Sequence, residues 1–204
     1  MSDRTSHWQT VYTTKGETDV SWYQDNPATS LRLIRDAAGT PSSHIIDIGG
    51  GASRLVDALL AAGFRQLSVL DISAAALDVA RAQIGDAAAT VDWIAADVTT
   101  WTPHGHYDIW HDRAAFHFLT GERDRRAYVE RLRQAVRPGG QVIIGTFALD
   151  GPERCSGLPV QRYDARSLAE TLGPLFELVD SCSEAHRTPW GAGQQFQFAR
   201  FRRV

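Results

Sequence analysis

Titratable side chains gather at the ends of predicted strands in this sequence. Asp71 ends one strand, and a second group lies at the end of the predicted strand 107–111. The second group comprises His111, Asp112, Arg113 and His117, beside Trp110. Ligands of open parallel sheets bind beyond the carboxyl ends of the strands, so we expect both groups to face one site. Asp71 can accept hydrogen bonds from a ribose diol. His111 or His117 can act as a general base, because an imidazole titrates near neutral pH.

The elements that position Asp71 lie within residues 43–73 and read as strand, glycine turn, helix and strand. The first strand, 44–48, is rich in isoleucine, as a strand covered on both faces requires. Three glycines at 49–51 let the backbone turn sharply and approach a ligand closely, because no Cβ is in the way. Ser53 is a candidate cap for the helix, and Gly63 is placed to end it. This order predicts a nucleoside-binding β-α-β unit.

The glycine turn distinguishes between two kinds of nucleoside ligand. A dinucleotide fingerprint needs G-x-G-x-x-G, and the run from Gly49 to Arg54 lacks the third glycine. With Asp47 before it, the run instead resembles motif I of the class I S-adenosylmethionine (SAM)-dependent methyltransferases, hydrophobic-hydrophobic-D-x-G-x-G-x-G. Ser53 stands where that motif has its last glycine. The resemblance covers about residues 43–204 and implies SAM as the cofactor and S-adenosylhomocysteine (SAH) as the product.

The resemblance also implies which residues bind the cofactor. The glycine turn would run alongside the methionine part of the cofactor, and Asp71 would bind the ribose. Asp97, after the third strand, would bind the adenine amino group beside the backbone amide of Val98. Asp112 is a candidate for the cofactor's ammonium, and Arg113 for its carboxylate. The expected cofactor-binding residues are Trp22, Asp47, Gly49, Gly50, Gly51, Ser53, Asp71, Ile72, Asp97, Val98, Asp112 and Arg113.

The polar group at the fourth strand has a structural interpretation as well. Asp112 and Arg113 can form an ion pair with each other, and Phe116 and Phe118 can enclose His117. The sequence leaves this alternative open beside the catalytic one, in which His111 or His117 is the base.

Residues 1–26 form an N-terminal arm ahead of the expected methyltransferase domain, residues 27–204, and show no clear helical or strand periodicity. The aromatic residues of the arm can cover the edge of the core, or the arm can be a lid that excludes water from the ligand. The Trp-Tyr pair in SWYQDNPATSL resembles the arm of a methyltransferase subgroup that includes some protein-lysine methyltransferases. In that subgroup the arm packs over the methionine part of the cofactor, which implies roles for Trp22, Tyr12 and Lys15.

The last third of the chain predicts the remaining elements. The R-P-G-G at 137–140 predicts a turn before the strand 141–147 and resembles L-x-P-G-G of the same family. Residues 148–163 predict a long loop able to wall the acceptor pocket, with Cys155 as an exposed thiol. Segments 176–187 and 194–202, joined by TPWGAG, predict an antiparallel hairpin. With the resemblance, this pattern gives a doubly wound α/β fold, a mostly parallel seven-stranded sheet that ends in a C-terminal antiparallel hairpin.

Composition narrows the class of protein. The chain has 204 residues, a formal net charge of −3 and two cysteines. The length suits a single domain, the charge disfavours a nucleic-acid partner, and two cysteines are too few for a disulfide framework. No zinc spacing occurs, so no metal is expected. No signal peptide or membrane-spanning run is present, so we expect a cytoplasmic protein without a membrane partner.

The expected activity is methyl transfer from SAM to a small-molecule nucleophile. A protein-lysine methyltransferase is the main alternative, although such an enzyme needs an open groove for its protein substrate. No D/N-P-P-[YF] motif follows the fourth strand, which disfavours amide-type acceptors such as adenine or glutamine. A non-catalytic SAM-binding module and an NAD-dependent oxidoreductase are more remote alternatives.

Overall fold

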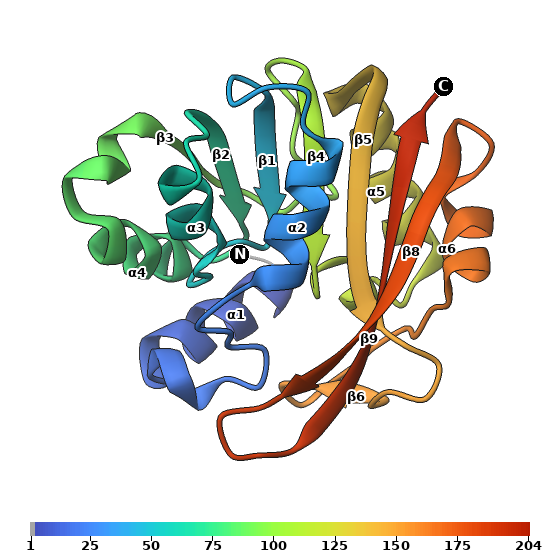
Figure 1. Cartoon of the computed structure of the whole chain (residues 1–204). Coiled ribbons are helices and arrows are strands. Elements are labelled where there is room, and N and C mark those ends of the chain that lie inside the picture. Colours follow the sequence, from blue (N-terminus) through green and yellow to red (C-terminus); the bar gives the residue numbers. More distant parts are fainter. Residues whose placement is uncertain (1–2) are drawn as a thin grey trace.

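The computed structural model describes residues 3–204, apart from the side chain of Glu17. The strands of its central sheet are β1 (His44–Ile48), β2 (Gln66–Asp71), β3 (Val91–Ala95), β4 (Tyr107–Arg113), β5 (Val136–Phe147), β8 (Phe176–Arg187) and β9 (Gly193–Arg203). Their order in the sheet is β3-β2-β1-β4-β5-β9-β8 (Figure 1). The first five strands pair in parallel, and β9 pairs antiparallel with both β5 and β8. The expected fold class, including its C-terminal hairpin, is confirmed.

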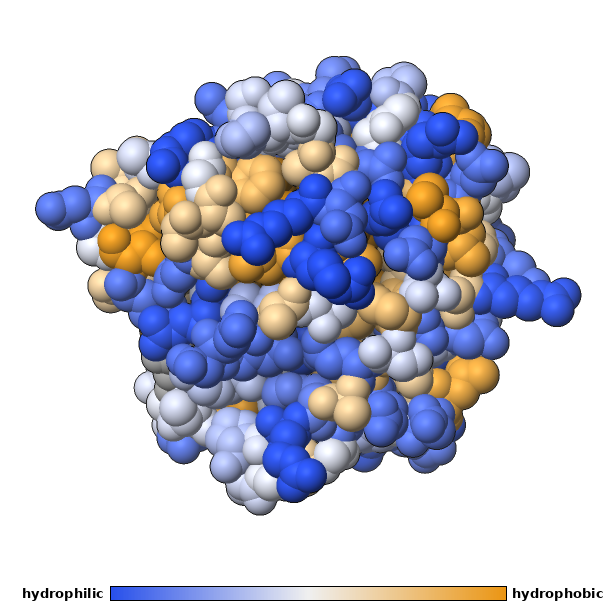
Figure 2. Space-filling model, in the orientation of Figure 1, coloured by the Kyte–Doolittle hydropathy of each residue, from blue (hydrophilic) through white to orange (hydrophobic). Residues whose placement is uncertain are grey.

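Helices cover both faces of the sheet. They are α1 (Asp3–Thr14), α2 (Ala28–Ala37), α3 (Leu55–Ala61), α4 (Ala74–Ile84), α5 (Glu122–Ala135) and α6 (Ala165–Leu172), with short 3-10 turns η1 (Glu17–Asp19), η2 (Gly85–Thr90) and η3 (Phe116–Phe118). Side chains of α2, α3 and α4 pack on one face around Ile45, and side chains of α5 and α6 pack on the other around Ile46 and Ile48. Successive strand residues point to opposite faces, so Asp47 shares the α2 side with Ile45. The surface seen in Figure 2 is mostly hydrophilic, because the two clusters hold most of the large apolar side chains.

The N-terminal arm is more ordered than its sequence indicates. Residues 3–14 form the helix α1, although their polar composition shows little helical periodicity. The helix lies below the carboxyl ends of β1 and β2 (Figure 1), where it contacts α4. Only Trp8 and Val11 of this helix are buried. Tertiary packing of these two side chains therefore stabilises a helix that periodicity does not reveal.

Three local expectations are corrected by the structure. Ser53 does not cap α3, which begins at Leu55, because the turn continues through Arg54; the Ser53 hydroxyl accepts a bond from the Leu55 amide at 3.1 Å. Residues 137–140 lie within β5, where an irregular register against β4 accommodates them. Cys155 is buried, because residues 148–163 contain a small hairpin of β6 (Arg154–Cys155) and β7 (Leu158–Pro159) that packs its thiol inward.

Other local signals match the structure. Ser73 accepts a hydrogen bond from the Ala76 amide at the start of α4, and Asp164 accepts one from the Ser167 amide at the start of α6. Gly63 has a φ of +94°, a left-handed conformation that favours glycine. None of the helices in the described part of the chain has the length and apolar run that a bilayer crossing requires.

Candidate active site

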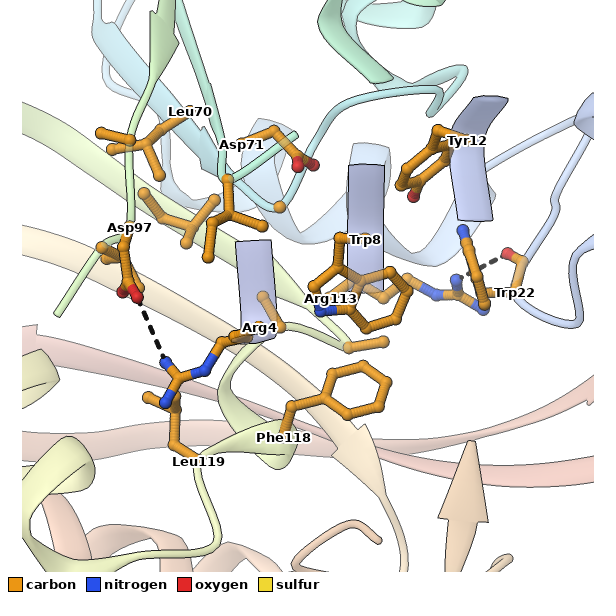
Figure 3. Close-up of a pocket in the computed structure, with 17 residues that line it drawn as sticks. Arg4, Trp8, Tyr12, Trp22, Leu70, Asp71, Asp97, Arg113, Phe118 and Leu119 are labelled. Atoms are coloured by element: carbon orange, nitrogen blue, oxygen red, sulfur yellow. Dashed lines mark hydrogen bonds and ion pairs between the residues drawn. The ribbon is translucent and has the colours of Figure 1, made fainter. Parts of the chain in front are cut away.

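A first cavity of about 700 Å³, open solvent at its mouth included, lies between α1 and the carboxyl ends of β1, β2 and β4. Figure 3 shows its walls, with α1 on one side and the ends of the parallel strands on the other. Its lining residues are Arg4, Trp8, Tyr12, Trp22, Ile48, Gly49, Leu70, Asp71, Ile72, Ala96, Asp97, Val98, Arg113, Ala114, Ala115, Phe118 and Leu119. The cavity is thus at the sheet edge where open α/β sheets bind ligands.

Asp71 and the glycine turn form the floor of this cavity. The Asp71 carboxylate accepts hydrogen bonds from the backbone amides of Gly51 at 3.1 Å and Ser73 at 2.8 Å. A Cβ on Gly51 would lie only 2.6 Å from Oδ2 of Asp71, so only glycine allows this close approach. Burial raises the pKa of Asp71 to about 6, because enclosing the carboxylate outweighs the stabilising backbone bonds.

Asp97 lies across the cavity from Asp71 and is partly exposed. Its Oδ1 accepts hydrogen bonds from the amide of Thr99 at 2.9 Å and from the hydroxyl of Thr99 at 2.7 Å. Its Oδ2 lies 3.6 Å from the guanidinium of Arg4, which reaches across from α1 (Figure 3) and also pairs with Asp124. One carboxylate oxygen is therefore held by its own loop and the other by the N-terminal helix.

Aromatic rings form the wall that α1 contributes. The Trp8 ring meets Phe118 edge-on at 4.9 Å and Trp22 at 5.6 Å between centroids. Tyr12 lies 6.2 Å from Trp22 in a similar edge-on arrangement. Arg4, Trp8 and Tyr12 repeat every four residues, so they share one face of α1 and point into the cavity together (Figure 3).

A second cavity adjoins the first on the α2 side of the glycine turn. Its lining residues are Tyr12, Trp22, Tyr23, Gln24, Pro27, Ser30, Asp47, Gly49, Gly50, Ala52, Ser53, Arg54, Leu55, His111 and Arg113. Tyr12, Trp22, Gly49 and Arg113 line both cavities and therefore mark their junction.

A hydrogen-bonded chain of three side chains lines the second cavity. Nδ1 of His111 lies 2.7 Å from Oδ1 of Asp47, and Nε2 lies 2.9 Å from Oγ of Ser30. All three side chains are buried. Both ring nitrogens of His111 are therefore engaged by side chains of the protein itself.

Arg113 contributes a buried positive charge at the junction. Its guanidinium donates to the carbonyl of Trp22 at 3.0 Å, lies 3.5 Å from Glu184 and sits 4.4 Å above the ring of Phe196. Burial lowers the pKa of Arg113 to about 10, so the group stays charged at neutral pH. Within the described residues its Nε has no hydrogen-bond partner. A buried donor in that state is suited to a ligand with an anionic group.

Asp112 does not lie beside Arg113 at the site, contrary to both sequence-based interpretations. Strand β4 continues to residue 113, so the two side chains point to opposite faces of the sheet. The Asp112 carboxylate is fully buried on the α5 side, where it accepts bonds from the amide of Phe116 at 3.1 Å and the hydroxyl of Tyr128 at 2.8 Å. It lines neither cavity, so it is unavailable to hold the ammonium of a ligand there.

His117 is likewise removed from the two cavities. Its ring is fully buried against Phe118 and Phe147, and its Nδ1 accepts a bond from the Phe147 amide at 3.4 Å. Burial, with a smaller contribution from Arg113, lowers the pKa of His117 to about 3. His117 lines neither cavity, so the structure does not place its ring where the expected general base would contact a ligand.

The structure brings most of the other expected residues together. Gly49, Asp71, Ile72, Asp97, Val98 and Trp22 line the first cavity, and Asp47, Gly50 and Ser53 line the second. The backbone amide of Gly51 donates a hydrogen bond to the Asp71 carboxylate. Lys15 is exposed and lines neither cavity. Among the described residues, no group of three or more His, Cys, Asp or Glu side chains is arranged to hold a metal ion.

Sequence reasoning missed Arg4, Trp8 and Ser30. The four-residue spacing of Arg4, Trp8 and Tyr12 places them on one face only once residues 3–14 are known to be helical, and the sequence does not show that helix. Ser30 has no local signal either, because its position in α2 gains meaning only from His111 on β4.

Comparison with known proteins shows which family the central part of the chain resembles. Residues 45–140 match the family described as a methyltransferase domain. The fold is similar to that of a SAM-dependent methyltransferase from Anabaena variabilis, with 16% identity, a TM-score of 0.78, and coverage of 100% of this chain and 96% of that chain. No curated protein matches the chain.

Several of the similar structures contain bound SAH. One is the 1,6-didemethyltoxoflavin-N1-methyltransferase of Burkholderia thailandensis, with 20% identity, a TM-score of 0.73, and coverage of 98% of this chain and 87% of that chain. Another is the N-methyltransferase NodS of Bradyrhizobium japonicum WM9, with 17% identity, a TM-score of 0.73, and coverage of 98% and 99%. The central part of the chain therefore matches a methyltransferase domain, and the chain as a whole has the fold of the class I SAM-dependent methyltransferases.

Proposed function

We propose that this enzyme transfers the methyl group of SAM to a small-molecule nucleophile, with the nucleoside part of SAM in the first cavity and its amino-acid part in the second. The observation that carries this placement is the position of Asp71 and Asp97 in one cavity beside the glycine turn. A carboxylate at Asp71 suits a ribose diol. Asp97, with the backbone of Val98, suits the adenine edge.

The residues present fit this cofactor in size and charge. Gly49 has a φ of +69° and a Cβ there would meet Ala115 at 2.8 Å, so the turn keeps its close course only with glycine. The buried Nε of Arg113 is an unused donor for the cofactor's carboxylate. Asp47, Gly50 and Ser53 line the cavity proposed for the same end of the molecule.

The junction of the two cavities is the place proposed for the reacting methyl group. When bound, SAM supplies a methyl group on a positively charged sulfur, and the acceptor lone pair displaces that sulfur in line. Tyr12 and Trp22 line the junction, and aromatic faces attract positive charge. The protein mainly holds the two reactants in line, and such positioning can lower a barrier by roughly 7–11 kcal/mol.

Enclosure of the site favours a small acceptor over a protein. Trp8 and Tyr12 of α1 close the first cavity from one side, and Trp22 closes the junction. The segment that carries Trp22 is held in place by three polar contacts: His186 to the Ser21 carbonyl at 2.7 Å, Arg113 to the Trp22 carbonyl at 3.0 Å, and Gln24 to Glu184 at 2.9 Å. A protein-lysine substrate needs an open groove at this point.

Calorimetric titration with SAH, run beside NAD and NADP, tests the cofactor placement. We expect SAH to bind with micromolar affinity and neither dinucleotide to bind. A screen of amines, thiols, carboxylates and lysine peptides, read out as SAH formation, then tests the acceptor class. Turnover of a protein or peptide with none of the small molecules would overturn the small-acceptor proposal.

A further inference from the structure

The second cavity contains a group suited to the cofactor's ammonium in place of the excluded Asp112. We infer that the Ser30 hydroxyl accepts a hydrogen bond from the α-ammonium of bound SAM or SAH, and that His111 links Ser30 to the negative charge of Asp47. The inference rests on the proposed placement of the cofactor and extends it to a residue outside motif I.

The chemistry of the three groups sets the direction of the chain. A carboxylate can only accept, so Nδ1 of His111 donates its proton to Asp47 across 2.7 Å. In the tautomer that carries the proton on Nδ1, Nε2 accepts the Ser30 proton across 2.9 Å. The lone pairs of the Ser30 oxygen are then free to accept a bond from a donor in the cavity. An ammonium carries only donors, so it is complementary to this end of the chain.

The fold explains why Asp47 would act on the cofactor through His111 and Ser30 and not by direct contact. Asp47 of β1 and His111 of β4 are direct neighbours in the parallel register, and Ser30 faces them from the first turn of α2. The relative exposures are 4% for Asp47, 1% for His111 and 1% for Ser30. The glycine turn lies over Asp47 so closely that a Cβ on Gly50 would be 2.2 Å from its Oδ2. The turn thus covers the Asp47 carboxylate, and the hydrogen bonds through His111 to Ser30 connect its negative charge to the cavity.

The second cavity as a whole is complementary to an amino acid. It combines the chain that ends in Ser30 with the guanidinium of Arg113, so it offers an acceptor for an ammonium and a donor for a carboxylate. The α-carbon of the cofactor carries both of these groups. This assignment gives His111 a role in cofactor binding, and no other histidine is among the described residues that line the two cavities.

A cycle of two proteins and two ligands tests the inference. The ligands are SAH and a SAH analogue in which hydrogen replaces the α-ammonium, and the proteins are the wild type and Ser30→Ala, all measured by calorimetry. We expect Ser30→Ala to weaken SAH binding about tenfold or more, because a hydrogen bond to a charged group is lost. The same substitution should change affinity for the deaminated analogue less than about twofold.

Further variants separate charge from structure. Asp47→Asn keeps an oxygen that can accept a hydrogen bond from His111 but removes the negative charge. It should therefore also weaken the binding of SAH more than the binding of the analogue. Ser42→Ala, at an exposed serine, serves as the matched control and should change neither affinity. Circular dichroism checks that each variant is folded. If Ser30→Ala does not fold, the comparison of SAH with the analogue in Asp47→Asn tests the inference instead.

Each outcome has a distinct meaning. An equal loss of affinity for both ligands in Ser30→Ala would show that Ser30 only shapes the cavity, and this would overturn the inference. Unchanged SAH binding would place the ammonium elsewhere and would also overturn it. Failure of the wild type to bind SAH would instead refute the proposed function itself.

Discussion

The guanidinium of Arg4 lies 3.6 Å from Oδ2 of Asp97, the carboxylate proposed to bind the adenine amino group. Arg4 also pairs with Asp124 of α5, so a single side chain of α1 bridges two acidic residues at the mouth of the first cavity. In this arrangement α1 covers the site, and Arg4 uses the oxygen that a nucleobase would need. We therefore expect this contact to loosen when the proposed cofactor enters.

Replacement of Arg4 by alanine is expected to speed SAH association. Partly exposed ion pairs contribute up to about 1 kcal/mol, so the association rate should rise by no more than about fivefold. Stopped-flow quenching of tryptophan fluorescence measures this rate, because Trp8 and Trp22 line the cavity. Arg166→Ala, which removes an exposed ion pair with Glu170, is the control. A slower association in Arg4→Ala would show that Arg4 assists binding.

Replacement of Asp71 by alanine is expected to weaken SAH binding at least tenfold. The carboxylate is proposed to accept bonds from the ribose diol, and hydrogen bonds to a charged group contribute roughly 1.5–3 kcal/mol each. Calorimetry at neutral pH measures the loss, with the melting temperature as a check on folding. Unchanged affinity would remove Asp71 from the ribose site.

The buried Asp71 also predicts a pH effect on stability. Its pKa is about 6 in the folded chain and near 3.8 when unfolded, so the folded state binds more protons between these values. This group therefore lowers the free energy of unfolding as pH rises from about 4 to 6, by roughly 3 kcal/mol in total. The stability of Asp71→Asn relative to wild type should rise across this range in urea unfolding at successive pH values. A difference independent of pH would contradict the raised pKa.

His117 predicts the opposite pH trend. Its folded pKa is about 3, below the ordinary 6.5, so the unfolded chain binds the extra proton and stability falls as pH drops through this range. The contribution lost between pH 7 and pH 5 is about 2 kcal/mol. His117→Phe should abolish this part of the acid destabilisation while it leaves SAH affinity within twofold. Loss of SAH binding would show that His117 supports the site.

Two glycine substitutions test the close approach of the turn to Asp71. In Gly51→Ala the new Cβ would lie 2.4 Å from Cβ of Ala76 and 2.6 Å from Oδ2 of Asp71, so we expect about 1–3 kcal/mol of destabilisation and weaker SAH binding. Gly39→Ala is the matched control, because its Cβ would meet nothing within 4 Å. Urea unfolding and SAH calorimetry on both variants provide the comparison. Equal effects of the two substitutions would contradict the steric argument.

Much of the fold and the first half of the site could be predicted from the sequence alone. Isoleucines at 44–48, the glycine run and Asp71 are local signals whose meaning depends on neighbours a few residues away. These signals predicted the β-α-β unit, and the resemblance of the glycine run to the methyltransferase motif implied the class of cofactor and the roles of Asp71 and Asp97. The segments of the C-terminal hairpin were equally readable, because alternation and turn residues define them locally.

Tertiary structure alone decided which polar residues face the cavities. Asp112 and Arg113 are adjacent in sequence, yet the extension of β4 by two residues sends them to opposite faces of the sheet. His117 lies in a polar stretch but is enclosed by Phe118 and Phe147, and Ser30 meets His111 across 81 positions of the chain. Local patterns determine the backbone course, because propensity and periodicity act over a few residues. Which side chains meet depends on how distant elements pack, and that information is not local.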